Sequence, residues 1–582
     1  RENLTDEQRR RIHNALSPFG LAPDGFAKGS GAEGPEHLLV SALYRVHPES
    51  TAKYLIETDP AFTDRRKFLS SDYMYQRLRW DPDKVPKRIG DGFYEQQLLA
   101  EQILRQTGKR HLDGYTDDEA AFQALMDAGI SYAEEMNIAP GVALTKEQIE
   151  ALTSDMIWLE EREVYVRGKK ERAVYPVLYM KNTNGLRLTA GGSLISAKNI
   201  SVETTKALKN AGTLYAENIR AHAGDIENEG LILAKDIALT SDTDIKTTGT
   251  IQGESSVLLD AKDNIYAQST TAKLPYQDVL DQTADISVRG DEGTLLMRAG
   301  KNIELTGANL SAQGKNGSIQ LTAGNDIVLD TKRLQSEKDM TLDSSNYLRT
   351  KRGTEFVTEI QADGNVNLAA GNDLSARAAA IASKNADVSL SAGNDVNITA
   401  GTETAEDHYA MRYKERGLFS SKTTAIRTDS QERSALSANI SGKNIHISAA
   451  KDAELQAANV IADGNANVSA TRNLTLSSAE NYARLDHYKE VKKSGLFSSG
   501  GLGFTIGTQR TKTDHDREAT TQQGTNIAAL GGNVSLTAGE TAHLTSANVL
   551  AGKEASVTAK ETTIDGRENV YRESYTKEVK TS

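Results

Sequence analysis

Short runs of alternating apolar and polar residues recur from Leu194 to the end of the chain. Ile327-Val328-Leu329 and Val396-Asn397-Ile398 are two of them, and the second follows the turn-forming pair Gly393-Asn394. A period of two is typical of a strand with one buried face, and a Gly-Asn pair lets the chain turn at the end of such a strand. Helices need apolar residues three and four positions apart, so this pattern predicts β-structure.

Equivalent positions in these runs are separated by about one short coil. The spacing is 19 residues from Ala197 to Ala216 and 22 from Gly371 to Gly393. Such a period indicates a solenoid, whose stacked coils bury the apolar face that one coil cannot bury alone. We predict a mainly β chain with a right-handed parallel β-helix, because parallel crossovers are right-handed. Roughly 16 to 18 coils at about 4.8 Å would form a rod on the order of 80 Å long. The side chains expected to point inward are Ile327, Leu329, Val396, Ile398, Ile445 and Ile447.

The first part of the chain has a different character. Nine of the ten prolines and both tryptophans precede residue 177, whereas stacked strands need every backbone donor. We therefore predict a smaller, mainly helical segment over residues 1–180 and the repeat β-helix over residues 181–582. A helix is expected from Tyr94 to Gln106, and Thr145-Lys146-Glu147-Gln148 has the pattern of a capping box.

Charged, tyrosine-containing segments interrupt the repeats. Asp407-His408-Tyr409 recurs 79 residues later as Asp486-His487-Tyr488. We predict insertions at about 345–360, 405–434 and 480–525, with a truncated one from about 567 that predicts a fragment of a longer chain. About two coils separate consecutive insertions, and two coils span about 10 Å, the distance at which sheets pack face to face. The insertions are therefore expected to stack into a ridge on one side, with Asp407 and Asp486 within about 20 Å and Tyr409 and Tyr488 at equivalent places.

Composition excludes several classes of function. The net charge of -12 argues against binding to nucleic acid as the main activity, and a chain with no cysteine has no disulfide, thiolate metal site or Cys nucleophile. No apolar run approaches the roughly 18 residues that span a bilayer.

Candidate chemistry is sparse, and we predict no catalytic, cofactor-binding or metal-binding residues. The Asp of Gly393-Asn394-Asp395 could suggest calcium, but one Asp per coil favours a structural turn. His408 and His487 have no third ligand nearby in the sequence and are expected to be exposed strand residues. Parallel β-helices also include polysaccharide-active enzymes, but the charges in these repeats are scattered singly rather than clustered.

The aromatic and basic residues of the first segment, such as Trp80 and Tyr75 near Arg77 and Arg88, could stack on nucleic acid or glycans. Amphipathic core packing explains the aromatic residues without any ligand.

The largest apolar cluster of the C-terminal half lies in the insertion near residue 500. Packing against the solenoid and contact with a partner or a membrane remain alternatives for this cluster, because exposed apolar patches tend to mark interactions. The candidate interaction residues are Leu496, Phe497, Leu502, Phe504, Ile506, Tyr409 and Tyr488.

Several of these segments resemble those of a known family. The repeats, the Gly-Leu-Phe-Ser-Ser segments at 417–421 and 495–499, and the stretches 71–74, 88–96 and 140–145 are similar to the hemagglutinin-repeat region of two-partner secretion exoproteins, of the filamentous hemagglutinin and contact-dependent growth inhibition type.

That resemblance implies a non-enzymatic structural segment of a secreted bacterial surface exoprotein. It implies an outer-membrane transporter as partner, contact with a target-cell or host surface or with the target's outer membrane, and a periplasmic stage for part of the chain before delivery. The implied role is a toxin-delivery scaffold, with an adhesin stalk as the alternative and a polysaccharide-active enzyme as the least favoured one.

Overall fold

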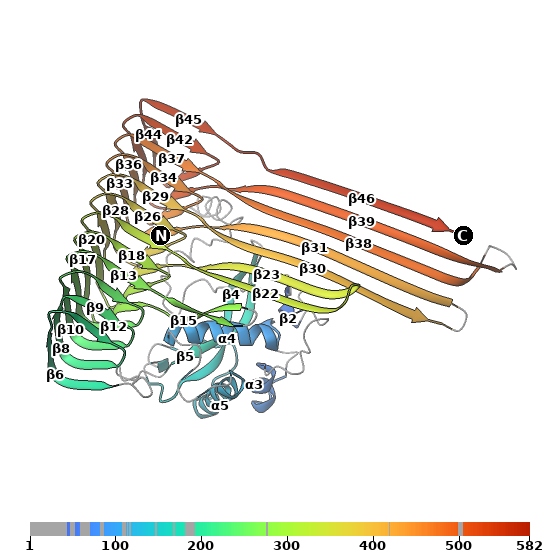
Figure 1. The fold of residues 1–582 in the computed structure, drawn as a ribbon, viewed down its shortest axis with the longest axis horizontal. Helices are drawn as coiled ribbons and strands as arrows, with labels where there is room; N and C mark the ends of the chain where they lie inside the picture. Colours follow the sequence, from blue (N-terminus) through green and yellow to red (C-terminus); the bar gives the residue numbers. More distant parts are fainter. Residues whose placement is uncertain are drawn as a thin grey trace.

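The protein consists of a small α/β domain, a parallel β-helix and a long antiparallel sheet that projects from the side of the β-helix (Figure 1). The structure is a computed structural model. It describes residues 44–46, 53–58, 70–81, 87–107, 112, 115, 118–145, 148–149, 151–166, 169–180, 193–274, 277–417, 420–498 and 504–582.

In its described residues the small domain combines three helices with a five-stranded sheet in the order β1-β2-β3-β5-β4. The helix expected from Tyr94 to Gln106 is confirmed as α4, whereas the five-stranded sheet goes beyond the mainly helical segment that was predicted. The bounds are β1 Tyr44–Val46, β2 Tyr54–Thr58, α3 Asp72–Arg77, β3 Arg88–Gly90, α4 Gly92–Thr107, α5 Asp118–Met136, β4 Met156–Val166 and β5 Lys169–Tyr179.

Two local features explain how this domain packs. Gly129 brings α5 against β4, since a Cβ atom there would lie 2.0 Å from the Ile157 carbonyl oxygen. The predicted capping box is confirmed: the Thr145 backbone N–H donates to Gln148 Oε1 over 2.8 Å, and the Gln148 N–H donates to Thr145 Oγ1 over 3.2 Å.

The first four coils of the β-helix each have one long and one short strand. Parallel pairing between equivalent strands stacks the coils, as in Leu214 beside Ile232. The bounds are β6 Leu194–Glu203, β7 Ala207–Asn210, β8 Thr213–Ala223, β9 Asp225–Asn228, β10 Leu231–Ser241, β11 Ile245–Thr247, β12 Thr250–Ala261 and β13 Ile265–Gln268.

After β12 the long strand is replaced by two shorter ones, so each later coil has three strands. Residues 250–253 of β12 pair with β16 and residues 256–261 pair with β17, and two parallel ladders continue from there. The first ladder is β16 Asp285–Val288, β19 Asn309–Ala312, β24 Glu359–Ala362, β27 Ala380–Ser383, β32 Asn439–Gly442, β35 Asn459–Ala462, β40 Asn526–Ala529 and β43 Asn548–Ala551. The second is β17 Thr294–Ala299, β20 Ser318–Ala323, β25 Val366–Ala370, β28 Val388–Ala392, β33 Ile445–Ala449, β36 Ala466–Ala470, β41 Val534–Ala538 and β44 Ala555–Thr558.

The remaining sheet of the β-helix has 12 strands, one per coil. Across the described part of the solenoid this gives 12 coils and a length of about 50 Å at ~4.8 Å per coil. The prediction of 16 to 18 coils was wrong, because the insertions use residues that a uniform period assigns to coils. Besides β7, β9, β11 and β13, this sheet contains β18 Ile303–Thr306, β21 Ile327–Asp330, β26 Leu374–Arg377, β29 Val396–Thr399, β34 Ala453–Gln456, β37 Asn473–Ser477, β42 Thr541–Thr545 and β45 Glu561–Asp565.

The alternating apolar residues form one continuous core along the β-helix. Ile398 is 0% exposed and stacks between Ala376 and Leu455 of the adjacent coils. The other side chains predicted to point inward are at most 1% exposed, namely Ile327, Leu329, Val396, Ile445 and Ile447. The predicted register of these strands is therefore confirmed.

The Asp of each Gly-Asn-Asp turn joins one coil to the next. Asp326 Oδ1 accepts the Asp373 backbone N–H over 2.9 Å, and Asp373 Oδ1 accepts the Asp395 N–H over 3.1 Å. Asp395 Oδ1 in turn accepts the Asp452 N–H over 3.1 Å. These carboxylates satisfy backbone donors of the stacked coils, in agreement with their interpretation as structural turns.

From the fourth coil onward, hairpins leave the β-helix after every second coil and join into a nine-stranded antiparallel sheet, which we call the hairpin sheet (Figure 1). Its strands, in order, are β14 Thr270–Leu274, β15 Gln277–Gln282, β22 Lys332–Asp343, β23 Asn346–Phe356, β30 Gly401–Arg416, β31 Ser420–Leu436, β38 Ala479–Ser498, β39 Phe504–Gln523 and β46 Val570–Thr581. The insertion expected at 345–360 begins earlier, at Lys332, and the β14–β15 hairpin was not predicted.

The common direction of the insertions is confirmed, but their mode of stacking differs from the prediction. Consecutive hairpins pair edge to edge through backbone hydrogen bonds, as β31 pairs with β38, instead of packing face to face. Two coils rise by about 9.6 Å, and a hairpin adds two strands at the same ~4.8 Å spacing, so the two repeats match. Asp407 pairs with Ser430, which pairs with Leu485, so Asp407 and Asp486 lie about 10 Å apart, as expected.

Candidate interaction surface

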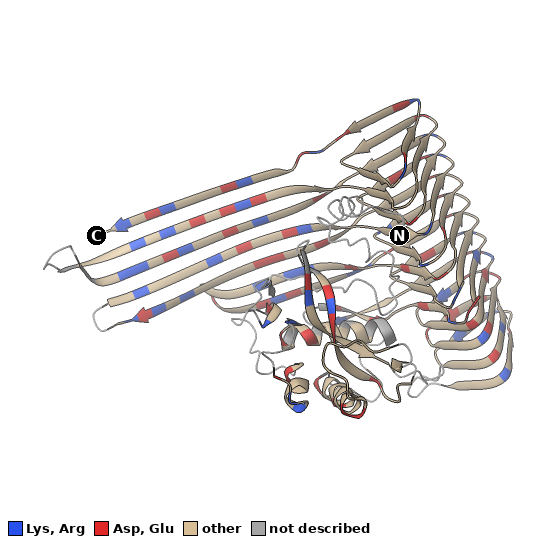
Figure 2. Cartoon of the chain, turned by 180° about the vertical axis from the view of Figure 1, so that it is seen from behind, with Lys and Arg blue, Asp and Glu red and all other residues tan. Residues whose placement is uncertain are grey.

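The hairpin sheet projects from the side of the solenoid and does not contribute to the solenoid core (Figure 1). Strands β38 and β39 each have 20 residues, against four or five in most solenoid strands. Figure 2 shows charged residues at many positions along the long strands of this sheet, whereas most strands of the solenoid have few. Residues directly opposite each other across the strands form transverse rows, and successive rows point to opposite faces of the sheet.

The register places Tyr409 and Tyr488 on opposite faces. Tyr409 shares a row with Thr428 and His487, whereas Tyr488 lies in the next row. The expectation that the two tyrosines occupy equivalent places was wrong. The two motifs are 79 residues apart, but strands β30 and β38 align with an offset of 78, and a shift of one residue turns a side chain to the other face.

His408 lies between two carboxylates on the face that it shares with Tyr488. Its Nδ1 is 2.7 Å from Asp429 Oδ1 and its Nε2 is 2.7 Å from Glu406 Oε1, and these hydrogen bonds raise the pKa of the imidazole. His487 is on the other face, with its Nδ1 2.9 Å from Thr428 Oγ1. The sheet therefore does not bring the two histidines together. Across the residues that the structure describes, no group of three His, Cys, Asp or Glu side chains is arranged to hold a metal ion.

An acidic row runs beside His408. Asp429, Asp486 and Asp516 are directly opposite one another on three successive strands. Burial, together with the neighbouring carboxylate of Asp514, raises the pKa of Asp486. Like charges in such positions destabilise a sheet, so this part of the sheet contributes repulsion rather than stability.

The apolar cluster lies at the end of the hairpin sheet farthest from the solenoid (Figure 1). Ile506 is 82% exposed and pairs with Leu496, so it does not pack against the coils. Phe497 and Phe504 lie in the paired strands beside it, and Leu502 falls outside the described residues. Of the two alternatives, the exposure of Ile506 favours contact with a partner or a membrane.

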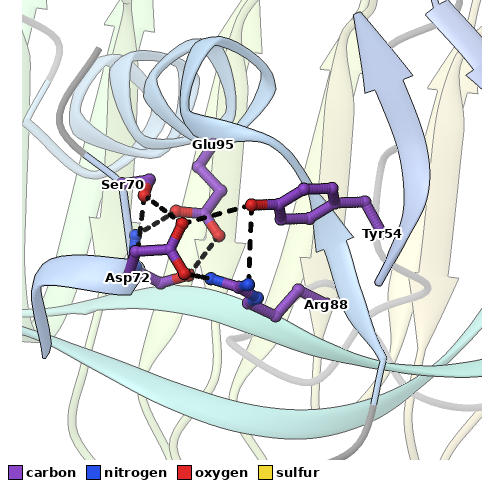
Figure 3. A network of polar contacts seen from close by, with 6 residues as sticks. Tyr54, Ser70, Asp72, Arg88 and Glu95 are labelled. Carbon is purple, nitrogen blue, oxygen red and sulfur yellow. Dashed lines mark hydrogen bonds and ion pairs between the residues drawn. The ribbon is translucent and has the colours of Figure 1, made fainter. Parts of the chain in front are cut away.

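A second polar site lies inside the small domain and connects two of the family-like stretches, 71–74 and 88–96 (Figure 3). Arg88 is 2% exposed and forms an ion pair with Asp72 from α3, whose Oδ2 also accepts a 3.1 Å hydrogen bond from the Tyr54 hydroxyl. The Arg88 guanidinium lies 4.7 Å from the centroid of the Tyr54 ring. This network fixes α3 against β2 and β3.

Glu95 of α4 completes the network. Its two carboxylate oxygens accept hydrogen bonds from the Ser71 backbone N–H over 2.7 Å and the Ser71 hydroxyl over 2.5 Å. Burial raises the pKa of Glu95 to about 7, against the lowering effect of these hydrogen bonds and of Arg88. This network was not predicted: Asp72 and Glu95 lie in stretches noted for their resemblance to a family, and Arg88 was considered as a basic residue near Trp80 and Tyr75. The available signal was the stretches Ser71-Asp72 and Arg88 to Gly92 themselves.

The aromatic residues Tyr75, Tyr94, Trp80 and Trp158 pack in or against the core of this domain, as predicted from amphipathic core packing without a ligand. Tyr75 and Tyr94 are 1% and 0% exposed, and the Trp80 ring makes edge contacts with Tyr75 and Trp158 at centroid distances of 5.6 and 6.2 Å. Among the described residues, no helix combines the length and apolar character needed to cross a membrane.

Comparison with known proteins relates this architecture to a family. Residues 341–411 and 419–579 match the hemagglutinin repeat. The 16S rRNA endonuclease CdiA of Enterobacter cloacae is 30% identical over 90% of this chain and 18% of its own length. The tRNA nuclease CdiA-2 of Burkholderia pseudomallei is 25% identical over 91% of this chain and 19% of its own length, and Toxin CdiA of Yersinia pestis is 28% identical over 97% and 19%. No solved structure matches.

The repeat match and the parallel β-helix define a hemagglutinin-repeat segment. Over about nine tenths of its length the chain is similar to exoproteins of the filamentous hemagglutinin and contact-dependent growth inhibition type. It spans about a fifth of the length of the curated relatives that it matches.

Proposed function

We propose that this segment is a toxin-delivery scaffold within a secreted, surface-displayed exoprotein and that it has no catalytic activity of its own. In this proposal residues 181–582 are the scaffold domain and residues 1–180 a smaller domain before it. The observation that carries the proposal is the match between the two-coil spacing and the two strands of each hairpin. That match makes one continuous sheet out of separate insertions and presents it at a fixed place on the rod.

The relatives support delivery over attachment alone. Several have names that describe toxins or nucleases, and the match to each covers about a fifth of its length. By this relation we propose an outer-membrane transporter of the two-partner type as the secretion partner, and a target-cell surface, including its outer membrane, as the surface contacted. Part of the chain would remain in the periplasm before delivery. An adhesin stalk remains the alternative.

The test is a truncation that shortens only the longest hairpin. Tyr488 and Asp514 pair directly, so residues 489–513 can be replaced by Asn-Gly, which forms a two-residue hairpin turn, without changing any coil. In the exoprotein that carries this segment, we expect delivery into target cells to fall by roughly tenfold or more, the effect of losing about 1.4 kcal/mol of contact free energy. Secretion and surface display should be unchanged.

A matched truncation controls for shortening a hairpin as such. Lys338 pairs with Thr350, so residues 339–349 can be replaced by Asn-Gly in the β22–β23 hairpin. This control should retain delivery. Equal delivery by all three proteins would contradict the proposal, and loss of cell attachment together with delivery would favour the adhesin alternative.

A further inference from the structure

The hairpin sheet has a strong charge gradient along its strands (Figure 2). We define its outer half as residues 411–416, 420–426, 489–498, 504–513 and 577–581, which are the ends of five strands farthest from the solenoid. This half contains 11 Lys or Arg and three Glu. The remaining residues of the same five strands contain five Arg and 11 Asp or Glu. A chain with a net charge of -12 therefore concentrates positive charge at one end of the sheet.

One row of the outer half is almost entirely cationic. The register places Lys414, Thr423, Lys492, Arg510 and Lys580 directly opposite one another on five strands. Three of these cations are on adjacent strands, about 5 Å apart, where like charges destabilise a sheet. A row that costs stability in the isolated sheet is the arrangement expected where an anionic partner supplies the missing charge.

The ion pairs within the outer half involve only a minority of its Lys and Arg side chains, so most of them can interact with a partner. Among the described residues, Arg510 pairs with Glu490 over 2.8 Å, and the other two glutamates each pair with one lysine, Lys422 over 3.2 Å and Lys580 over 2.7 Å. Lys414 and Lys492 are exposed. The cations thus outnumber the nearby carboxylates, and water screens those that remain.

Hydroxyl and apolar groups lie just beyond this row. Ser421 and Ser494 are in the next row on the same face, with their Oγ atoms 2.8 Å apart. Ile506, one row farther out on that face, is 82% exposed. Cations and hydroxyls bind phosphate oxygens, and an exposed aliphatic side chain next to them suits the boundary between lipid head groups and acyl chains.

We propose that the outer half of the hairpin sheet is a docking surface for the phosphate groups of an anionic lipid surface. This inference rests on the proposed function and specifies the chemistry of the surface that the scaffold meets. The cationic row spans several strands, so it fits phosphates spread over a membrane surface better than one free phosphate ion. The aliphatic tip favours lipid over nucleic acid, which offers stacking bases and phosphates but no acyl layer.

The experiment uses the full 582-residue chain and sedimentation with vesicles. We expect binding to phosphatidylcholine vesicles that contain phosphatidylglycerol, weak binding to phosphatidylcholine alone, and loss of binding at high salt. The double variant Lys492→Gln with Lys580→Gln should bind the anionic vesicles about tenfold more weakly, because two of the cations that face the lipid are removed. It should fold normally, since it relieves repulsion within the row.

A second double variant is the matched control. Arg484→Gln with Arg572→Gln changes the same two strands on the same face by the same charge, but in the inner half. It should bind the anionic vesicles as the parent does. Equal weakening by both double variants, or equal binding of the parent to neutral and anionic vesicles, would overturn the inference. So would tighter binding to single-stranded RNA than to vesicles, or full competition by millimolar inorganic phosphate.

The result separates this inference from the proposed function. If the hairpin truncation abolishes delivery while the parent chain shows no preference for anionic vesicles, the scaffold role stands and the lipid surface is rejected.

Discussion

Replacing Ile398 by Asp should lower the free energy of unfolding of the β-helix by about 3–5 kcal/mol, because it places an uncompensated charge in a dry core. Ile398 is 0% exposed and stacks between Ala376 and Leu455. Neither neighbour offers a hydrogen-bond donor from its side chain. Urea unfolding followed by circular dichroism at a β-sheet wavelength measures the change.

Asn397 provides the matched control for this substitution. It is the next residue on the same strand, points outward and is half-buried. Asn397→Asp introduces the same charge and should lower the unfolding free energy by no more than about 1 kcal/mol, the size of the repulsion from Glu454 directly opposite on the adjacent strand. Similar unfolding curves for Ile398→Asp and the parent would show that the core register described for this strand is incorrect.

The small domain should become less stable as the pH rises from about 4.5 to about 7, because of Glu95. Its pKa is raised from 4.5 to about 7 in the folded state, so between these values the folded chain binds more protons than the unfolded chain. The stabilisation is complete below the unfolded pKa and is lost as the pH passes the folded pKa. The shift corresponds to a loss on the order of 3 kcal/mol.

Trp80 and Trp158 are the two tryptophans of the chain and both lie in this domain, so their fluorescence reports its unfolding in the intact protein. Glu95→Gln keeps an oxygen that accepts from the Ser71 N–H and removes the titration. The variant should therefore show little of the decline between these pH values. A decline of the same size in Glu95→Gln would assign the pH dependence to groups other than Glu95. Asp72 would not be one of them, because its pKa is lowered in the folded state and it therefore stabilises the fold as the pH rises.

The repeats allowed the β-helix and the face of each strand to be predicted, because alternation at Val396-Asn397-Ile398 determines which side chains are buried. The number of coils was not predictable from the period. An insertion was predicted only at about 345–360, yet the hairpin β22–β23 already begins at Lys332. Backbone pairing with β30 decides that assignment, and neither segment shows this long-range contact in its own sequence.

The candidate surface was predicted in part for a similar reason. The recurrence of Asp407-His408-Tyr409 indicated equivalent insertions, but the one-residue difference between motif spacing and strand register placed Tyr409 and Tyr488 on opposite faces. The cationic row could not be predicted from the sequence either. Its members are far apart in sequence, Lys414 and Lys580 being 166 residues apart, and only the register of five strands aligns them.

The most direct test of the two-coil spacing and the sheet that it builds is a disulfide between consecutive hairpins. The chain has no cysteine of its own, and Thr428 Oγ1 lies 2.9 Å from His487 Nδ1 across β31 and β38. We expect Thr428→Cys with His487→Cys to form an intramolecular disulfide on mild oxidation, detected as a cross-linked peptide by mass spectrometry. Thr428→Cys with Tyr488→Cys should not form one, because these side chains are on opposite faces. A disulfide in the second pair but not the first would contradict this register, and its absence from both would contradict pairing between the hairpins.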